Sequence, residues 1–170
     1  MKSHKIIYTD GGCPTNGSIN AVGSWAFVEI AEVEFGPVGD KEVKALKKDS
    51  GYLRPDHLLP NTSIRMELIA IIKGLESFKE SETIEVYSDS AYCVNGIKQQ
   101  WYRTWLATGK NSQGKVPANM DLWIRLVELL RHHNVMAFHV KGHSGNTFND
   151  IVDVMATTEI RNYYEVEGDK

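Results

Sequence analysis

A chain of 170 residues, of which 42 % are hydrophobic, is long enough to fold as one domain around a sizeable core. Its formal net charge of −3 excludes a globally basic protein, so any contact with nucleic acid must come from a local positive surface. Two cysteines form no disulfide framework, and no apolar run is long enough for a signal peptide or a membrane span. We therefore expect a soluble, cytoplasmic protein that acts as a monomer.

The first part of the chain predicts two antiparallel strands. Residues 5–10 and 23–30 are rich in β-branched and aromatic residues, and a glycine- and asparagine-rich loop over 11–21 joins them. The first strand ends in Asp10, directly before two glycines. Residues 31–60 carry few signals, and we expect only a third strand within 47–54.

An amphipathic helix is predicted next, with Thr62 or Ser63 as its N-cap. Its apolar positions recur at helical spacing, at Ile64, Leu68, Ile71, Ile72, Leu75 and Phe78. Glu67 lies at the edge of this apolar face, where a carboxylate is unfavourable unless it is paired or binds a cation. The alternative is an ordinary glutamate that reaches water.

A second acid follows a second predicted strand. Residues 84–88 are followed by Asp89, and residues 87–89 repeat the Tyr-(Thr/Ser)-Asp pattern of residues 8–10. If the two strands lie side by side and parallel, both acids project from the carboxyl edge of the sheet, where ligands of open α/β sheets bind. Each acid alone is more often a turn former or a helix N-cap, but two in matched contexts favour a metal site.

Basic and aromatic residues gather after this strand. Ser90 is predicted to cap a helix that runs to Trp101, and the aromatic residues continue to Trp105. Between residues 90 and 120 the chain has four basic residues and no acid, which suits a polyanion backbone. The alternative is a solvated helix end with tryptophans in the core, and the sequence does not separate the two.

The last third predicts a helix, a strand and a helix. Asn119 is expected to cap the first helix, residues 135–140 form the strand, and a final helix begins near Asn149. In that final helix Asp153 lines up with apolar residues, whereas Asp150 lies on a polar face. Asp153 is therefore the better candidate for a buried site.

The acidic residues predict a particular chemistry. Two unit charges ~4 Å apart repel by about 4 kcal/mol at an effective dielectric constant of about 20, so clustered acids need cations. With oxygen ligands only, the fitting ions are Mg²⁺ or Mn²⁺. Two such ions favour in-line attack on a phosphodiester, and His143, in a glycine-flanked loop, could move a proton near neutral pH. The candidate ligands are Asp10, Glu67, Asp89 and Asp153.

Four motifs together resemble type 1 ribonuclease H of the bacterial kind. They are Asp10-Gly-Gly-Cys, Arg65-Met-Glu67-Leu, Tyr87-Ser-Asp89-Ser and Lys141-Gly-His143-Ser, with Asp153 ten residues after the histidine. The resemblance implies an α/β fold with a five-stranded mixed sheet, three strands antiparallel and then two parallel, and helices on both faces. From the length and the polar last residues we expect one domain over residues 1–165 and a frayed tail over 166–170. The implied activity is endonucleolytic cleavage of the RNA strand of RNA–DNA hybrids with two Mg²⁺, leaving 5′-phosphate and 3′-hydroxyl ends.

The resemblance also assigns roles to single residues. Asp10 would bridge both ions, Glu67 and Asp89 would hold one, and Asp153 the other, while His143 would assist turnover. The residues implied to bind substrate are Gly11, Cys13, Asn16, Thr62, Ser63, Trp101, Trp105 and Asn119.

Three departures from the family pattern concern substrate binding. Ser63 and Ile64 stand where amide side chains usually contact the minor groove, Pro60 replaces an arginine of the phosphate pocket, and residues 106–108 lack a basic cluster. We therefore expect weaker and less salt-sensitive hybrid binding than in basic relatives.

Two alternatives remain open from the residues alone. One is a transposase-, integrase- or resolvase-like enzyme that acts on DNA with the same carboxylates. The other is a hybrid-binding module without catalysis, against which the presence of all four acids and His143 argues.

Overall fold

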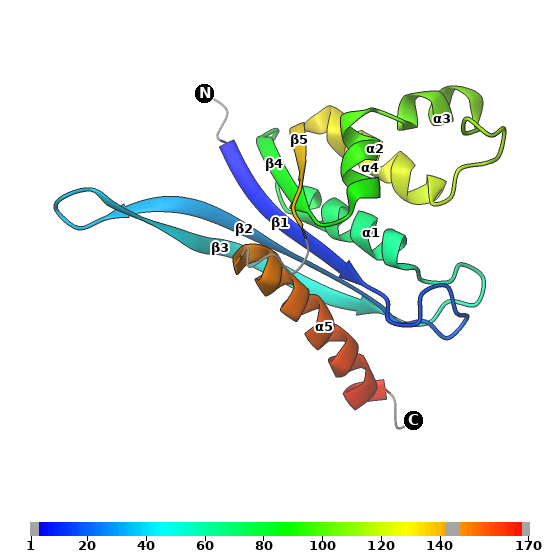
Figure 1. Cartoon of the computed structure of the whole chain (residues 1–170), viewed down its shortest axis with the longest axis horizontal. Coiled ribbons are helices and arrows are strands. Elements are labelled where there is room, and N and C mark those ends of the chain that lie inside the picture. The colour runs from blue at the N-terminus through cyan, green and yellow to red at the C-terminus, as the bar shows by residue number, and fades with distance from the viewer. Residues whose placement is uncertain (1–3, 142–146, 168–170) are drawn as a thin grey trace.

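The computed structural model describes residues 4–141 and 147–167. These residues form five strands and five helices around one mixed sheet (Figure 1). The elements in chain order are β1 (His4–Gly12), β2 (Gly23–Phe35), β3 (Asp40–Leu53), α1 (Ser63–Glu76), β4 (Thr83–Ser88), α2 (Ala91–Lys98), α3 (Tyr102–Thr108), α4 (Met120–His132), β5 (Asn134–His139) and α5 (Thr147–Glu167). Among the helices of these described ranges, none combines the length and the apolar character needed to cross a bilayer.

The sheet has the order β3-β2-β1-β4-β5, so β1 lies at its centre. β1 pairs antiparallel with β2 and parallel with β4, and Tyr8 lies opposite Tyr87 in the parallel register. β2 and β3 pair antiparallel, and β4 and β5 pair parallel. The expected fold, three antiparallel strands followed by two parallel ones, is confirmed.

Helices cover both faces of the sheet, and β1 contributes to both cores (Figure 1). Ile7 packs into the larger core with Leu68 of α1, as the helical spacing of the apolar residues predicts. Tyr8, one residue on, packs into the smaller core with Val152 of α5. The period-2 alternation of a strand therefore accounts for the two apolar layers.

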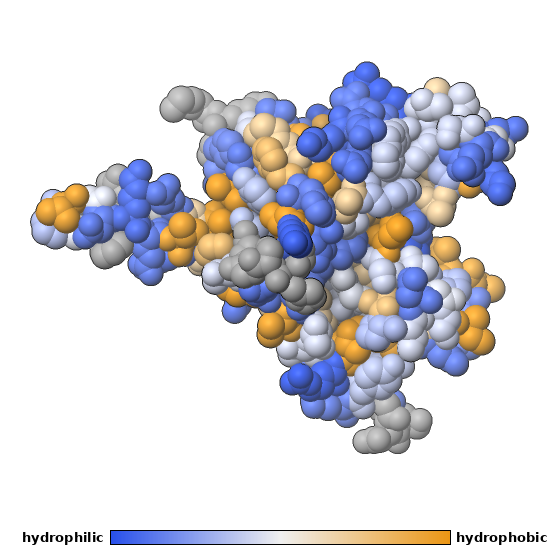
Figure 2. Space-filling model, in the orientation of Figure 1, coloured by the Kyte–Doolittle hydropathy of each residue, from blue (hydrophilic) through white to orange (hydrophobic). Residues whose placement is uncertain are grey.

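The region over residues 31–60 differs most from the sequence-based expectation. Instead of a short third strand within 47–54, β2 and β3 continue to residues 35 and 40 as a two-stranded ribbon that projects from the body (Figure 1). Gly36 and Gly39 both have positive φ, 76° and 72°, and close the turn. In Figure 2 the ribbon is hydrophilic along much of its length. Polar and apolar residues do alternate over Glu32-Val33-Glu34-Phe35, but this run is only four residues long and the turn glycines follow it directly, so it was not read as part of a strand.

The helix expected to run from Ser90 to Trp101 is in fact two helices. α2 ends at Lys98, and Gln100 adopts the left-handed region with φ of 56°. The backbone N–H of Trp101 donates to the carbonyl of Gly96 (3.2 Å), and that of Gln100 donates to Ile97 (3.3 Å). This hydrogen-bond pair is a Schellman motif, which usually has glycine where Gln100 stands, so no residue at this position signals the end of the helix.

Candidate active site

Three acids from distant segments converge at the carboxyl edge of the sheet. Asp10 near the end of β1, Glu67 in α1 and Asp89 after β4 each offer a carboxylate oxygen, and these oxygens lie within 4.8 Å of one another. Asp10 is 4 % exposed and Glu67 is 9 % exposed, whereas Asp89 is half-buried. The predicted cluster of these three acids therefore forms.

The parallel register and one glycine bring these acids together. Because Tyr8 pairs with Tyr87, the two Tyr-(Thr/Ser)-Asp segments end at the same level of the sheet. Gly11, directly after Asp10, lies against the backbone of α1, where an added Cβ would come within 2.5 Å of the backbone nitrogen of Glu67. Only glycine permits this approach, which places Glu67 beside Asp10.

The electrostatics of the cluster favour a bound cation. Burial, together with the charges of Asp89 and Asp153, raises the pKa of Asp10 from 3.8 to about 7, although a hydrogen bond from Glu67 acts in the opposite direction. Burial and the charge of Asp10 hold the pKa of Glu67 well above its usual value. Among the described residues, the buried Oε2 of Glu67 has no hydrogen-bond partner. Buried acids and an unsatisfied oxygen fit a hard divalent ion such as Mg²⁺ or Mn²⁺.

Asp153 approaches the same cluster from α5. Its carboxylate raises the pKa of Asp10 by charge and hydrogen bonding, and both residues line a cavity of about 250 Å³ together with Ser24. Asp150 lines a different hollow. The choice of Asp153 over Asp150 as the inward acid therefore agrees with the geometry. His143 lies outside the described residues.

The expected substrate residues near Asp10 gather at the start of α1. The side-chain oxygen of Asn16 accepts a hydrogen bond from the backbone N–H of Ser63 (2.7 Å), and Thr62 caps α1 by accepting from the backbone N–H of Arg65 (3.1 Å). Cys13 is buried, and its thiol donates to the carbonyl of Asn61 (3.4 Å). The Cys13 side chain therefore belongs to the core, and only its backbone could reach a ligand.

Arg65 connects two of the expected phosphate-pocket residues, a role that its place in the Arg65-Met-Glu67-Leu motif did not predict. Its backbone bonds to Thr62, and its guanidinium donates to Asn119 Oδ1 (3.2 Å) and to both carboxylate oxygens of Asp121 (2.9 Å each). Arg65 is only 8 % exposed. The one available signal was a charged residue two positions before Glu67, in a helix that is otherwise apolar there.

Asn119 lies at the N-cap position of α4 as expected, but its side chain does not cap the helix. Its backbone has φ of 64°, and the side chain turns to Arg65 instead. The expectation of a side-chain cap was wrong because the left-handed backbone does not have the extended conformation that a capping side chain requires.

The two tryptophans after α2 have different environments. Trp105 is 9 % exposed and packs edge-on against Trp123, with ring centroids 5.4 Å apart. Trp101 is half-buried and donates from Nε1 to Gln99 (3.1 Å). Both line a cavity of about 570 Å³ with Tyr92 and Pro117. Trp105 therefore belongs to the core, whereas Trp101 is partly accessible, and a contact of either tryptophan with a polyanion stays a prediction.

A histidine beside Asp89 was also missed. His139, at the end of β5, donates from Nε2 to the backbone carbonyl of Asp89 (3.1 Å). The backbone N–H of Val140 donates to the carbonyl of Ser88 (2.9 Å), so β5 holds the segment from which Asp89 projects. No residue spacing in the sequence indicates this contact, because it depends on the parallel pairing of β4 and β5.

The chain is similar in sequence to known ribonucleases H over most of its length. The RNase H family model matches residues 2–161. Ribonuclease H of Clostridium botulinum (strain Hall) is 38 % identical over 152 residues, which cover 89 % of this chain and 91 % of that protein. Ribonuclease H of Prosthecochloris aestuarii is 37 % identical over 163 residues, which cover 95 % of this chain and 99 % of that protein.

Solved structures share the fold. LC9-RNase H1, a type 1 RNase H with the type 2 active-site motif, superposes with a TM-score of 0.73 at 23 % identity, covering 93 % of this chain and 72 % of that one. LC11-RNase H1, solved in complex with an RNA/DNA hybrid, has a TM-score of 0.60 at 18 % identity and covers 92 % of this chain and 99 % of that one. At these identities the likeness shows the fold alone.

Proposed function

The chain belongs to the ribonuclease H family, and we propose that it is an endonuclease that hydrolyses the RNA strand of RNA–DNA hybrids. The observation that carries this proposal is the convergence of Asp10, Glu67 and Asp89 within 4.8 Å, with Asp153 beside them. The named relatives at 37–38 % identity support the substrate class.

We propose that two Mg²⁺ ions are the cofactors, with Mn²⁺ as a substitute. Asp10, Glu67 and Asp89 would hold one ion, and Asp10 and Asp153 the other. When bound, such ions stabilise the charge that develops on the scissile phosphate and lower the pKa of water. Because burial raises the pKa values of Asp10 and Glu67, any proton that these carboxyl groups hold must leave before they can act as metal ligands. His143 is proposed to move a proton at the same site.

The surroundings of the acids support a polyanionic substrate. Arg65 bonds to Asn119, and Asn16 bonds to Ser63, so polar groups from three segments gather at the start of α1. We propose that a phosphate of the DNA strand binds near Thr62 and Asn119, and that the RNA strand passes Asn16. The products would carry 5′-phosphate and 3′-hydroxyl ends. We further propose that the protein acts as a monomer in the cytoplasm.

One gel tests the proposal. Labelled RNA–DNA hybrid, single-stranded RNA and duplex DNA are each incubated with Mg²⁺ or with chelator, with wild type and with the Asp10→Asn variant. We expect Mg²⁺-dependent cleavage of the hybrid alone, and its loss in Asp10→Asn with hybrid binding retained. The matched control Asp150→Asn removes an acid that lines a different hollow, and it should cleave like wild type.

The same gel separates the alternatives. Cleavage of duplex DNA in preference to the hybrid would favour a transposase-like enzyme. Hybrid binding without cleavage by wild type would favour a non-catalytic module. Cleavage that survives Asp10→Asn would refute the assignment of the acids.

A further inference from the structure

A second cavity lies on the α3–α4 unit and shares no lining residue with the active site or with the aromatic cavity at Trp101 and Trp105. We call it the α3–α4 cavity. Its volume is about 620 Å³, which is within the range of ligand sites, roughly 300–1,000 Å³. Its floor is aliphatic and consists of Leu106, Ala107, Val127 and Leu130.

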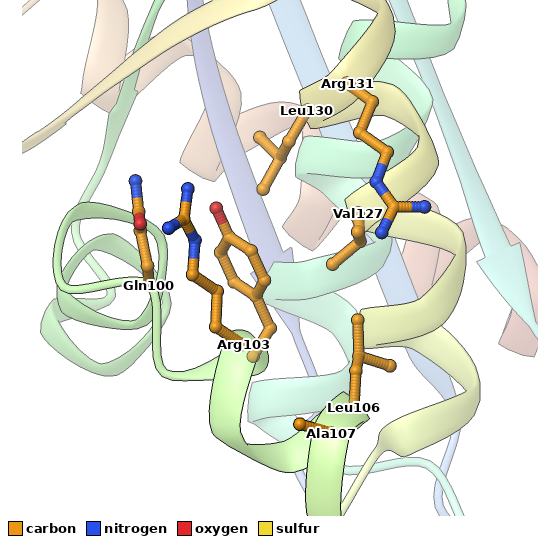
Figure 3. Close-up of a pocket in the computed structure, with 8 residues that line it drawn as sticks. Gln100, Arg103, Leu106, Ala107, Val127, Leu130 and Arg131 are labelled. Carbon is orange, nitrogen blue, oxygen red and sulfur yellow. The ribbon is translucent and has the colours of Figure 1, made fainter.

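Two arginines line this floor from opposite sides. Figure 3 shows Arg103 and Gln100 on one side of the cavity and Arg131 on the other. Arg131 pairs with Glu128 (3.1 Å) in an exposed contact of the kind that contributes little, and within the described part of the chain Arg103 forms no ion pair. None of the described residues that line the cavity is acidic. The site therefore presents two cations to one volume.

The remaining lining residues add groups that suit a nucleobase. Tyr102 lies in the lining with its ring stacked on Trp123, at a centroid distance of 6.3 Å and an angle of 24°. Gln100 supplies an amide that can both donate and accept hydrogen bonds. Guanidinium groups bind phosphate through paired N–H groups and stack on planar rings. Phosphate, planar base and apolar sugar face thus each have a matching group.

The charge of the surrounding chain favours a polyanion over a single carboxylate. Residues 90–120 contain four basic residues and no acid, and this stretch supplies α3 and five of the eight residues that line the cavity. Several phosphates in a row are attracted by all of these basic residues together, whereas one carboxylate forms an ion pair with only one of them. Leu106 and Ala107 make the floor apolar, and an apolar floor favours unpaired bases over the charged exterior of a duplex.

We propose that the α3–α4 cavity binds an unpaired segment of nucleic acid, with its phosphates between Arg103 and Arg131 and a base over Tyr102. This proposal rests on the proposed function, because the segment would be a single-stranded extension of the hybrid. Trp105 and Arg103 lie on different faces of α3, and a helix is about 10 Å across, a distance that a few extended nucleotides can span.

The test compares hybrids with and without a tail. Fluorescence anisotropy in chelator measures binding of a blunt hybrid, of the same hybrid with a single-stranded extension of about six nucleotides, and of that extension alone. We expect the extension to raise the affinity of wild type about fivefold, since each stacked base contributes roughly that much. The double variant Arg103→Gln/Arg131→Gln should lose this gain while its affinity for the blunt hybrid stays within about twofold.

A variant outside the cavity tests whether loss of an arginine elsewhere has the same effect. Arg125 lies in α4, as Arg131 does, but it pairs with Glu76 (2.5 Å) and does not line the cavity. The Arg125→Gln variant should therefore keep the gain from the extension. Circular dichroism confirms that each variant is folded. The free extension should bind wild type more tightly than the double variant, and this arm does not depend on hybrid binding. If the proposed function failed, the measurement on the free extension would therefore still test whether the cavity binds single-stranded nucleic acid.

Three results would overturn the proposal. The first is an extension that gives no gain in wild type, and the second is a gain that survives in the double variant. The third is displacement of the free extension by a glutamate peptide of equal charge as readily as by an unlabelled strand, since that would assign the cavity to acidic peptides.

Discussion

Asp10 and Glu67 offer carboxylate oxygens that lie within 4.8 Å of each other at the edge of the sheet, so a proton on either acid removes the repulsion between the two. The pKa of Asp10 is about 7 in the folded chain and 3.8 as its ordinary value. Without metal, the folded state therefore holds this proton over a pH range in which the unfolded chain releases it. Folding stability in chelator should fall as the pH rises from about 4 to about 7.

Replacing Asp10 with asparagine removes the buried charge that this carboxylate carries at high pH. In chelator at about pH 8 the Asp10→Asn variant should be more stable than wild type by about 2–4 kcal/mol, because a buried charge is replaced by a neutral amide of the same shape. Urea unfolding at two pH values measures the difference. Mg²⁺ should stabilise wild type and leave the variant nearly unchanged, and equal stabilisation of both by Mg²⁺ would contradict the role of Asp10.

Gly11 is predicted to be irreplaceable. Because an added Cβ would overlap the backbone of Met66 and Glu67, Gly11→Ala should move α1 away from β1, destabilise the fold by about 3 kcal/mol or more, and abolish cleavage. The control is its neighbour: in Gly12→Ala the new Cβ meets only the Ser24 side-chain oxygen at 3.1 Å, which should cost about 1 kcal/mol or less. Chemical denaturation compares the two, and similar losses would refute the steric argument.

His133 gives the stability an opposite dependence on pH. It is buried at the end of α4, accepts at Nδ1 from the backbone N–H of Glu82 (3.1 Å) and donates from Nε2 to Leu75 (3.2 Å). Burial, and then the neighbouring His132, lowers its pKa below 6.5. The unfolded chain therefore takes up the proton first, and stability should fall as the pH drops from about 7 to about 5.

The measurement for His133 is urea unfolding across this pH range with Mg²⁺ present, so that the Asp10 cluster is held in one state. Wild type should lose stability towards acid, and His133→Gln should be less stable at neutral pH but should show a flatter dependence. A variant with the same acid slope as wild type would exclude His133 as the cause.

Gln100 is predicted to be a site of stored backbone strain. A non-glycine residue at φ of 56° carries a penalty of about 1 kcal/mol, so Gln100→Gly should stabilise the fold by about 0.5–1 kcal/mol. Gly109, which ends α3 at φ of 71° with open space around it, is the reverse control, and Gly109→Ala should destabilise by a similar amount. Thermal unfolding measures the stability of both variants. A loss of stability in Gln100→Gly would show that the contacts of the Gln100 side chain stabilise the fold by more than the backbone strain costs.

The sequence predicted those parts of the molecule in which one face is apolar. The spacing of Leu68, Ile71 and Leu75 identified α1 because that face is buried, and the repeat at residues 8–10 and 87–89 identified the two central strands. It did not predict the ribbon at residues 31–44, because the alternation of Glu32-Val33-Glu34-Phe35 is only four residues long and ends at the turn glycines. The break at Gln100 escaped notice because a glutamine occupies a glycine position.

Within the candidate site, the sequence motifs and their spacing predicted the acidic residues. The contacts around these acids depend on how distant elements pack together. Arg65 and Asp121 are 56 positions apart, and His139 and Asp89 are 50 apart, so no local pattern connects either pair. Trp105 also required the fold, because only the position of Trp123 shows that its ring is buried.

The ribbon formed by the ends of β2 and β3 has a practical consequence. Beyond Ile30 the described pairing of its backbone is between β2 and β3, and Val38 at its tip is 80 % exposed. Exposed tips of this kind tolerate inserted or nicked sequence, since no core contact depends on them. A fluorophore, an epitope or a peptide could therefore be attached at residues 36–39 and used to follow the enzyme without altering its core or its acidic site.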